Sequence, residues 1–183
     1  MDGKFVKNKT WYRAGTVKNW SIKRSIELHL MVNDPFKVMK QWKKVKQFKR
    51  ALWHVEAHVD HNRILNWCQT HEIQGGLAIS PNTPLDVMTP YLFHKAFKRA
   101  LILGVSPGWS GQTLQTGTYR KARALRVLRP NMPIAFDGGV KKRNIPTLAR
   151  NGVTGFCAAS SIFKTKDPKT TINELKQLIR ELP

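Results

Sequence analysis

The strongest constraint on the fold is a regular alternation of short apolar runs with amphipathic segments along the chain. Unbroken apolar runs are typical of parallel strands that are buried on both faces, and the segments between them have helical spacing. A strand, helix, strand order that repeats about every 25 residues predicts right-handed crossovers in a parallel sheet. We expect strands at residues 26–32, 51–57, 75–80, 100–105, 133–137 and 155–159.

The segments between these strands predict helices. In Asp34-Pro35 and Asp167-Pro168 a capping carboxylate precedes a proline at the first helical position. Six strand–helix units are fewer than the eight of a complete barrel. We therefore expect a single α/β domain over residues 1–183, of the (β/α)8 TIM-barrel type but incomplete. The expected helices are residues 35–45, 61–71, 85–92, 118–128, 145–150 and 168–182.

The charge balance is unusual, because 32 Lys and Arg residues face 11 Asp and Glu residues, for a formal net charge of +21. Such a field attracts polyanions, so nucleic-acid binding is one hypothesis. Lys43, Lys44 and Lys46, with Lys49 and Arg50, have the spacing of the outer face of a helix, which favours a solvated surface instead. No RNA-recognition motif or finger spacing accompanies them, so a dedicated nucleic-acid role is the weaker hypothesis.

Exported and membrane classes are not indicated. No window approaches the roughly 18 apolar residues of a membrane helix, and the N-terminal residues lack the apolar core of a signal peptide. Cys68 and Cys157 have no Cys-x-x-Cys spacing, so neither a disulfide framework nor a zinc ribbon is indicated. We expect a cytoplasmic protein with no membrane partner.

Small residues gather where three successive strands are expected to end. Gly108 and Gly111 follow the fourth strand, Gly138 and Gly139 follow the fifth, and Ala159-Ser160 follows the sixth. Backbone N–H groups can converge on an anion where no side chain obstructs them. The pattern predicts a phosphate-binding cup, and the alternative is three ordinary turns.

Two polar residues in apolar strands are candidates for chemistry. Asp137 ends an apolar strand, where a carboxylate is costly to bury without a cation or donors, so it is a candidate metal ligand or general base. His29 is either a satisfied core histidine or the second half of such a metal site. The alternation of His54, Glu56 and His58, with Asp60 and His61 nearby, leaves a separate metal site as a further hypothesis.

Taken together, these strand ends resemble the ribulose-phosphate 3-epimerase family, which is a (β/α)-barrel family. The resemblance runs along nearly the whole chain in seven ordered motifs. They are Met1 to Asn8, His29 to Pro35, His54 to Ala57, Gly76 to Leu85, Pro107 to Gln112, Asp137 to Val140 and Ser160 to Phe163.

The resemblance implies roles for residues at the matching positions. His29 and Asp137 would bind a divalent metal ion (zinc, iron, manganese or cobalt), and Asp137 would also be one of two acid/base carboxylates. Met31, Leu103 and His54 would line the pocket around the reacting end of the substrate. The family usually has Met at position 103 and Gly at position 159, and the extra methyl group of Ala159 could weaken phosphate binding. The phosphate-binding residues would be Gly108, Trp109, Ser110, Gly111, Gly138, Gly139, Ala159 and Ser160.

The implied activity is the metal-assisted interconversion of D-ribulose 5-phosphate and D-xylulose 5-phosphate, by proton abstraction and return at C3, in the pentose phosphate pathway. The family's second catalytic Asp and another metal-binding His normally lie just upstream of the Met-Asp-Gly segment, together with the first strand, its helix and most of the second strand. We therefore expect residues 1–183 alone to have little or no epimerase activity, whether they are a fragment or a degenerate relative.

Alternative hypotheses are an epimerase of a hexulose 6-phosphate and a non-catalytic barrel that binds RNA or another polyanion. An incomplete sheet exposes strand edges, which favours pairing with another copy of the chain, so a homo-oligomer is expected.

Overall fold

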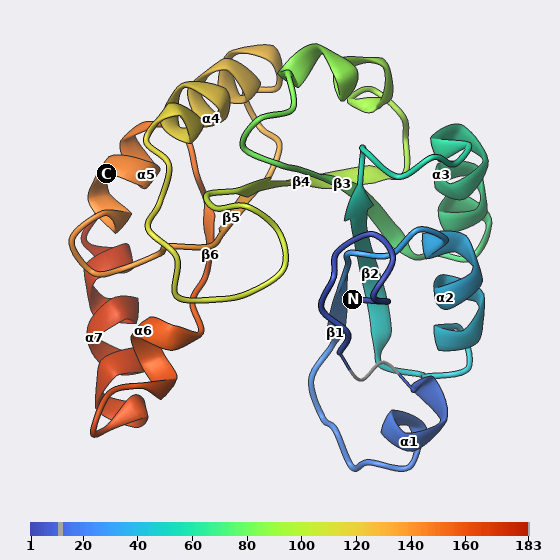
Figure 1. The fold of residues 1–183 in the computed structure, drawn as a ribbon, viewed down its shortest axis with the longest axis horizontal. Helices are drawn as coiled ribbons and strands as arrows, with labels where there is room; N and C mark the ends of the chain where they lie inside the picture. The colour runs from blue at the N-terminus through green and yellow to red at the C-terminus, as the bar shows by residue number, and fades with distance from the viewer. Residues whose placement is uncertain (11–12, 183) are drawn as a thin grey trace. The chain divides into compact units, whose positions relative to one another are not determined.

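The computed structural model describes residues 1–10 and 13–182 and contains six strands. Figure 1 shows them in the sheet order β1-β2-β3-β4-β5-β6, which is also their order along the chain. The pairings of β1 with β2, β2 with β3, and β5 with β6 are parallel. The strands are β1 (Ile26–Leu30), β2 (Phe48–His54), β3 (Gln74–Ile79), β4 (Phe97–Leu103), β5 (Ile134–Asp137) and β6 (Gly155–Cys157).

Helices connect these strands, as expected for parallel neighbours, which cannot be joined by a tight hairpin. The six described strands with their connecting helices have the arrangement of an incomplete (β/α) barrel, which confirms the predicted fold class. The helical elements are α1 (Ala14–Lys18), α2 (Pro35–Trp42), α3 (His61–Thr70), η1 (Leu85–Val87), η2 (Thr89–Tyr91), α4 (Gly117–Leu128), α5 (Ile145–Arg150), α6 (Ser160–Phe163) and α7 (Pro168–Arg180).

The chain divides into two compact units, which we call the N-terminal unit and the C-terminal unit. The N-terminal unit comprises Met1–Ile79 and Thr83–Ala100, and the C-terminal unit comprises Ser80–Asn82 and the residues from Leu101 onward. The boundary falls within β4, so the first four residues of this strand belong to one unit and the last three to the other.

Each unit has its own apolar core. In the N-terminal unit Leu52 and Trp53 of β2 and Leu65 of α3 are completely buried. In the C-terminal unit Phe136 of β5 and Leu125 of α4 are completely buried. Burial of a large apolar side chain stabilises the folded state by roughly 1.5–3 kcal/mol, so each core holds its strand ends in place.

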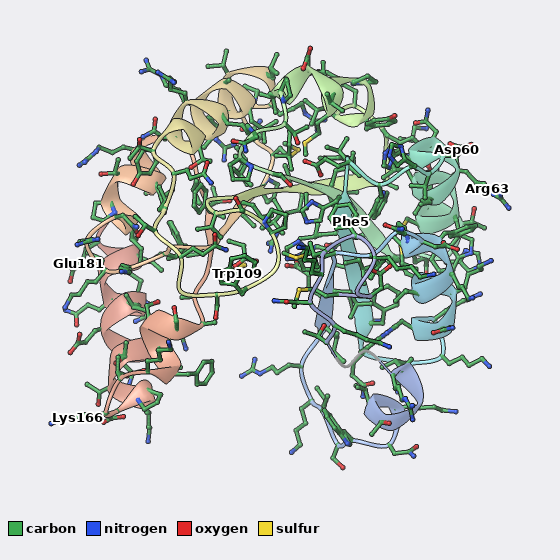
Figure 2. All side chains as sticks on the ribbon, in the orientation of Figure 1. Phe5, Asp60, Arg63, Trp109, Lys166 and Glu181 are labelled. Carbon is green, nitrogen blue, oxygen red and sulfur yellow. The ribbon has the colours of Figure 1, made fainter. Side chains whose placement is uncertain are left out.

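Local signals place the helix starts where the sequence predicts them. Asp34 accepts a hydrogen bond from the Lys37 N–H, and Asp167 accepts one from the Thr170 N–H. Asp60 caps α3 in the same way by accepting from the Arg63 N–H at 2.9 Å, and both residues are labelled in Figure 2. Each capping carboxylate satisfies an N–H group that the helix itself leaves unpaired.

Three predictions about the elements are wrong. Residues 85–92 form two 3₁₀ turns, not one α-helix, because Pro90 has no N–H to donate to an α-helical ladder. Strands β2 and β4 each begin three residues before the predicted start. Lys49 and Arg50 therefore belong to β2 and not to the outer face of a helix. None of the described helices is both long enough and apolar enough to cross a membrane.

Candidate functional site

In the N-terminal unit, two histidines meet at the carboxyl ends of β1 and β2. His29 pairs in register with Leu52, and side chains two residues apart in a strand share a face, so His29 and His54 lie on the same face of the sheet. Their Nε2 atoms are 3.1 Å apart, and the two rings stack with centroids 5.2 Å apart. His54 is completely buried, whereas His29 is half-buried.

A carboxylate holds the other side of His54. Glu56 lies two residues past His54, and its Oε2 is 3.0 Å from His54 Nδ1. The other carboxylate oxygen of Glu56 accepts a hydrogen bond of 2.5 Å from the Thr83 hydroxyl. We call Thr83, Glu56, His54 and His29 the carboxyl-end cluster, and all four residues belong to the N-terminal unit.

The alternative metal site built on His54, Glu56 and His58 is not found. Strand β2 ends at His54, and the His58 side chain is exposed. Among residues 1–10 and 13–182, no group of three or more His, Cys, Asp or Glu side chains is arranged to hold a metal ion. Asp60 instead caps helix α3. The alternation of polar residues along this segment therefore does not indicate a metal site.

His61 is used inside the core. Its Nδ1 accepts a hydrogen bond of 2.9 Å from the Trp53 indole N–H, and its Nε2 lies 3.1 Å from the carbonyl oxygen of Val55. Burial lowers the pKa of His61 below its ordinary value of 6.5, while the Val55 carbonyl and the nearby acids oppose this shift. His61 therefore supports the structure around the end of β2 and takes no part in a metal set.

In the C-terminal unit, Asp137 is the last residue of β5 and is half-buried. Its backbone carbonyl accepts a hydrogen bond of 2.7 Å from the Gly104 N–H, which ties the end of β5 to the end of β4. Leu103, the last residue of β4, is almost completely buried. The carboxylate thus stands at a strand end that neighbouring backbone holds in place.

The turn after β5 requires glycine at both of its positions. Gly138 and Gly139 have φ angles of +95° and +70°, which side-chain-bearing residues rarely adopt. A Cβ atom on Gly138 would lie 2.5 Å from Val105, and one on Gly139 would lie 2.7 Å from Leu114. The loop that follows β4 therefore packs directly against this turn.

That loop carries the predicted phosphate residues Gly108, Trp109, Ser110 and Gly111. The side-chain amide of Gln112 donates hydrogen bonds to the carbonyl oxygens of Ser106, at 2.8 Å, and Trp109, at 3.0 Å. These bonds hold the loop closed on itself. The Trp109 side chain, labelled in Figure 2, is 63% exposed and lies outside the core.

The third predicted segment follows β6. Asp137 pairs in register with Cys157, so the residues after them leave the sheet from adjacent strand ends. Ala159 is the N-cap of the short helix α6, which begins at Ser160. The three segments of the predicted cup thus follow the carboxyl ends of β4, β5 and β6, which all belong to the C-terminal unit.

The structure places His29 in the N-terminal unit and Asp137 in the C-terminal unit. Met31 directly follows β1 and is half-buried. The predicted site residues lie near the carboxyl ends of their strands or in the segments that follow these ends. The pairing of His29 with Asp137 around one metal ion stays a prediction.

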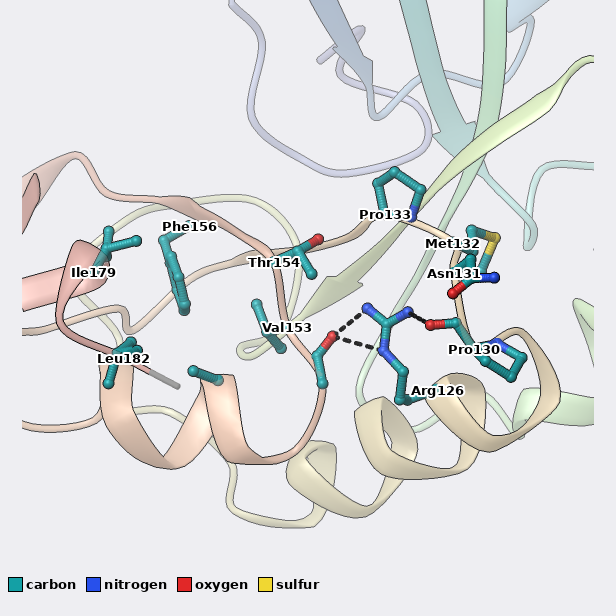
Figure 3. Close-up of a pocket in the computed structure, with 12 residues that line it drawn as sticks. Arg126, Pro130, Asn131, Met132, Pro133, Val153, Thr154, Phe156, Ile179 and Leu182 are labelled. Atoms are coloured by element: carbon teal, nitrogen blue, oxygen red, sulfur yellow. Dashed lines mark hydrogen bonds between the residues drawn. The ribbon is translucent and has the colours of Figure 1, made fainter.

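A cavity of about 500 Å³ in the C-terminal unit lies at the opposite strand ends. Met132 and Thr154, which line it, precede β5 and β6 and so mark their amino ends. Figure 3 shows Arg126 reaching across it, where the guanidinium donates to the carbonyl oxygens of Gly152 and Pro130. Because these bonds occupy its N–H groups, Arg126 serves here as a structural clamp.

Sequence reasoning did not identify the role of Thr83 or the hydrogen-bonding partner of Glu56. Both residues stand in segments that the sequence singled out, Gly76 to Leu85 and His54 to Ala57. The sequence signal that could have identified this contact is the carboxylate of Glu56 two residues after the buried His54. Its partner lies 27 residues further along the chain, and no spacing rule connects the two.

Comparisons with known proteins agree on one family. A sequence model described as the ribulose-phosphate 3 epimerase family matches residues 1–163. The ribulose-phosphate 3-epimerase of Candida glabrata is 32% identical over 158 residues, which are 85% of this chain and 62% of that protein. The enzymes of the same name from Aquifex aeolicus and Escherichia coli are each 30% identical, over 98% and 96% of this chain and 82% and 80% of those proteins.

Solved structures confirm the fold. The orotidine 5'-monophosphate decarboxylase of Sulfolobus solfataricus superposes with a TM-score of 0.68 at 12% identity, over 92% of this chain and 80% of that one. At this identity the likeness shows the fold alone, whereas the match over residues 1–163 is specific in sequence. The chain belongs to the ribulose-phosphate 3-epimerase family.

Proposed function

We propose that this chain carries the sugar-phosphate site of a ribulose-phosphate 3-epimerase. The observation that supports it most directly is the run of three glycine- and serine-rich segments after β4, β5 and β6, with Asp137 at the end of the middle strand. The names of the relatives support the substrate class, D-ribulose 5-phosphate and D-xylulose 5-phosphate.

The phosphate group would be held by backbone N–H groups of the cup. Glycine at positions 138 and 139 lets the main chain approach the phosphate oxygens without an intervening side chain. The net charge of +21 adds a field that draws in a sugar-phosphate dianion. Trp109 and Ser110 lie in the loop after β4 and would form the part of the cup that this loop contributes.

Asp137 would act as the base. Its carboxylate takes the proton from C3 of the sugar, and the electron pair of the broken C–H bond moves toward the C2 carbonyl to give an enediolate. Return of a proton to the opposite face of C3 gives the epimer and needs a second acid. By the family resemblance, no residue of 1–183 matches that acid, so these residues alone are expected to bind sugar phosphate with little turnover.

By the family resemblance, His29 and Asp137 are candidate ligands of a divalent cation, which would supply positive charge against the enediolate oxygens. The stacking of His29 against His54 fits a ligating histidine, because a ring nitrogen that does not bind metal usually has a fixed hydrogen-bond partner. Two donors do not complete a coordination shell, so further ligands are required.

We further propose a place in the cytoplasm, in the pentose phosphate pathway and in a homo-oligomer. A rice relative that is 27% identical is named as a cytoplasmic isoform, which supports the location. Neither the hexulose-phosphate nor the polyanion-binding alternative is favoured by the names of the relatives. Light scattering of the purified chain measures the oligomeric state directly.

The test separates phosphate binding from proton transfer. Binding of D-ribulose 5-phosphate is measured by calorimetry, and turnover is measured by a coupled assay. Asp137→Asn is expected to keep binding within about threefold and to lower any turnover at least 100-fold, since general-base catalysis contributes about 10²–10⁴-fold. A parent protein that does not bind D-ribulose 5-phosphate, or a measurable parent turnover that Asp137→Asn leaves unchanged, would end the proposal.

The cup itself is tested by a matched pair of glycines. Gly139 and Gly152 both have positive φ, and in both an added Cβ would meet a neighbour at 2.7 Å. Gly139→Ala and Gly152→Ala should therefore lose similar stability. Only Gly139→Ala should weaken ribulose 5-phosphate binding, by about tenfold or 1.4 kcal/mol. Equal weakening by both variants would count against the cup.

A further inference from the structure

Two arginines occupy matching positions in a five-residue repeat of the N-terminal unit. Strands β2 and β4 both begin with Phe-Lys-Arg-Ala-Leu, so Arg50 and Arg99 are each the third residue of their strand. Both donate from Nη1 to the same carboxylate oxygen of Glu27 on β1, at 2.6 and 3.1 Å. The repeat therefore brings two guanidinium groups onto one carboxylate at the amino ends of the strands.

The two arginines differ in what bonds to the other edge of the guanidinium group. For Arg50, Nε and Nη2 both donate to the side-chain oxygen of Gln74 on β3, and the bond from Nε is 2.7 Å long. For Arg99, the Nε atom is buried, and no group in the described part of the chain bonds to it. Nη2 of Arg99 has no bond to the described residues either. Arg99 thus keeps a pair of parallel donors that Arg50 has already used.

The charges at this end of the sheet favour a single negative charge. Two guanidinium groups, which do not lose their protons, and one carboxylate leave a net charge of +1. Lys49 and Lys98 directly precede the two arginines, and side chains alternate along a strand, so these lysines lie on the opposite face. A monovalent anion would make the group neutral, whereas a dianion would place excess negative charge beside Glu27.

The free edge of Arg99 matches the shape of a carboxylate. A guanidinium donor without a partner is costly where water does not reach it. Nε is such a donor, although the Arg99 side chain as a whole is 27% exposed. A carboxylate can therefore approach through Nη2 and extend its second oxygen to Nε. Two parallel bonds of this kind are the geometry in which arginine holds a carboxylate most firmly.

We propose that Arg99 binds the carboxylate of a small monovalent ligand through Nε and Nη2. The amide N–H groups of Gln74 would add a donor, because its oxygen faces Arg50 and β3 lies between β2 and β4. All of these residues belong to the N-terminal unit. None of them is part of the proposed sugar-phosphate site, so failure of that proposal would leave this one standing.

NMR on the parent protein tests the site with acetate as the probe. The readout is the Nε–H signal of Arg99, which burial should protect from rapid exchange with water. Acetate should shift this signal along a saturable curve, and chloride at the same ionic strength should not. No shift, a shift without saturation or an equal shift by chloride would overturn the proposal. Sulfate should bind more weakly than acetate, and tighter sulfate binding would overturn the assignment to a carboxylate.

Arg99→Lys and Lys98→Gln form a matched pair of variants. Arg99→Lys keeps the charge but removes the parallel donors, so the acetate affinity, followed by backbone amide signals of β3 and β4, should fall at least about tenfold. Lys98→Gln removes a positive charge from the opposite face and should keep the affinity of the parent protein. Equal losses in both variants would mean that the general positive field attracts acetate, and the site would be refuted.

Gln74→Glu tests the site without touching Arg99, and it keeps the proposal testable if Arg99→Lys does not fold. The variant supplies a carboxylate from the chain itself and removes the net positive charge of the group. Acetate should then no longer shift the Arg99 Nε–H signal, while urea unfolding should show no loss of stability. Acetate binding to Gln74→Glu with the affinity of the parent protein would contradict the proposal.

Discussion

Two polar clusters occupy opposite ends of the same sheet face in the N-terminal unit, and their chemistry differs. At the amino ends, Arg50 and Arg99 both donate to Glu27, at 2.6 and 3.1 Å, and Arg50 also bonds to Gln74. We call these four residues the amino-end cluster. Its charged side chains are 24–29% exposed, whereas the His54 side chain in the carboxyl-end cluster is completely buried.

The two clusters show that one sheet face can hold stabilising ion pairs at its amino end and candidate site residues at its carboxyl end. The amino-end cluster uses permanent charges that neutralise one another, because guanidinium groups do not lose their protons. The carboxyl-end cluster instead joins two imidazole rings, one carboxylate and one hydroxyl through hydrogen bonds. In (β/α) barrels the carboxyl ends of the strands carry the reacting groups and the amino ends carry stability, which matches this division.

The largest expected effect comes from the glycine that lies between the two clusters. A Cβ atom on Gly76 would lie 2.1 Å from the carbonyl oxygen of Arg99 and 2.6 Å from Leu52. Because backbone cannot yield as a flexible side chain does, Gly76→Ala should lower the free energy of unfolding by about 3 kcal/mol. Urea unfolding measures the loss.

Gly15→Ala is the control for this substitution, because no atom lies within 4 Å of the added Cβ. It should cause no loss of stability. An unfolding free energy for Gly76→Ala within about 1 kcal/mol of the parent protein would show that β3 and β4 can separate, and that the two clusters do not share a rigid face.

The next largest effect is a stability loss whose dependence on salt should differ between the two clusters. Glu27→Gln leaves Arg50 and Arg99 side by side without a counter-charge and should cost about 1 kcal/mol. Because these groups are partly exposed, roughly half of this cost should disappear in 1 M NaCl. Any stability lost in Glu56→Gln should not depend on salt. Urea unfolding at low and high salt measures both variants. If salt changes the stability loss of Glu27→Gln and of Glu56→Gln equally, the two clusters do not differ in their electrostatic contribution.

The amino-end cluster also explains the largest error in the element boundaries. Strands β2 and β4 begin with the same residues, Phe-Lys-Arg-Ala-Leu, from Phe48 and from Phe97. Lys and Arg at a strand start predict exposed segments, yet Arg50 and Arg99 turn toward Glu27. Glu27 lies 23 residues from one and 72 from the other. A pattern read over a short window cannot find a partner at that distance.

The sequence predicted which strands carry the candidate residues, but not the contacts between these residues. The apolar runs placed His29, His54 and Asp137 on three predicted strands, and Asp137 was correctly predicted as the last residue of its strand. The predicted strands 26–32 and 51–57 ran past His29 and His54, whereas β1 ends at Leu30 and β2 ends at His54. The contact between His29 and His54 joins residues 25 positions apart and depends on strand register. The short helix α6 was missed because four residues are too few to show a helical period.

His61, the first residue of α3, provides a comparison by pH. Because burial lowers the pKa of His61, the folded protein binds this proton less tightly than the unfolded chain does. The contribution of His61 to stability is therefore complete above its ordinary pKa of 6.5 and declines as the pH falls toward the lowered folded value. Unfolding free energies measured from pH 7.5 down to pH 5 should show this decline.

His61→Gln keeps an acceptor for the Trp53 N–H but has no proton to gain, so its stability should decline less over this pH range. His58→Gln, which changes an exposed histidine, should keep the slope of the parent protein. If His61→Gln has the same slope as the parent protein, the decline arises from other groups, and the buried ring of His61 does not make the fold sensitive to acid.

The smallest effect is expected at an ion pair in the C-terminal unit. Lys142 Nζ lies 3.2 Å from Glu174, a distance similar to those in the amino-end cluster, but the two side chains are 64% and 53% exposed. Exposed pairs gain little because water screens them, so Glu174→Gln should change the unfolding free energy by less than about 0.3 kcal/mol. Glu27→Gln removes the same charge from a carboxylate that two arginines share and that is less exposed. A loss as large in Glu174→Gln as in Glu27→Gln would mean that contact distance alone sets the strength of these pairs. The sharing of Glu27 between two arginines would then add nothing to stability.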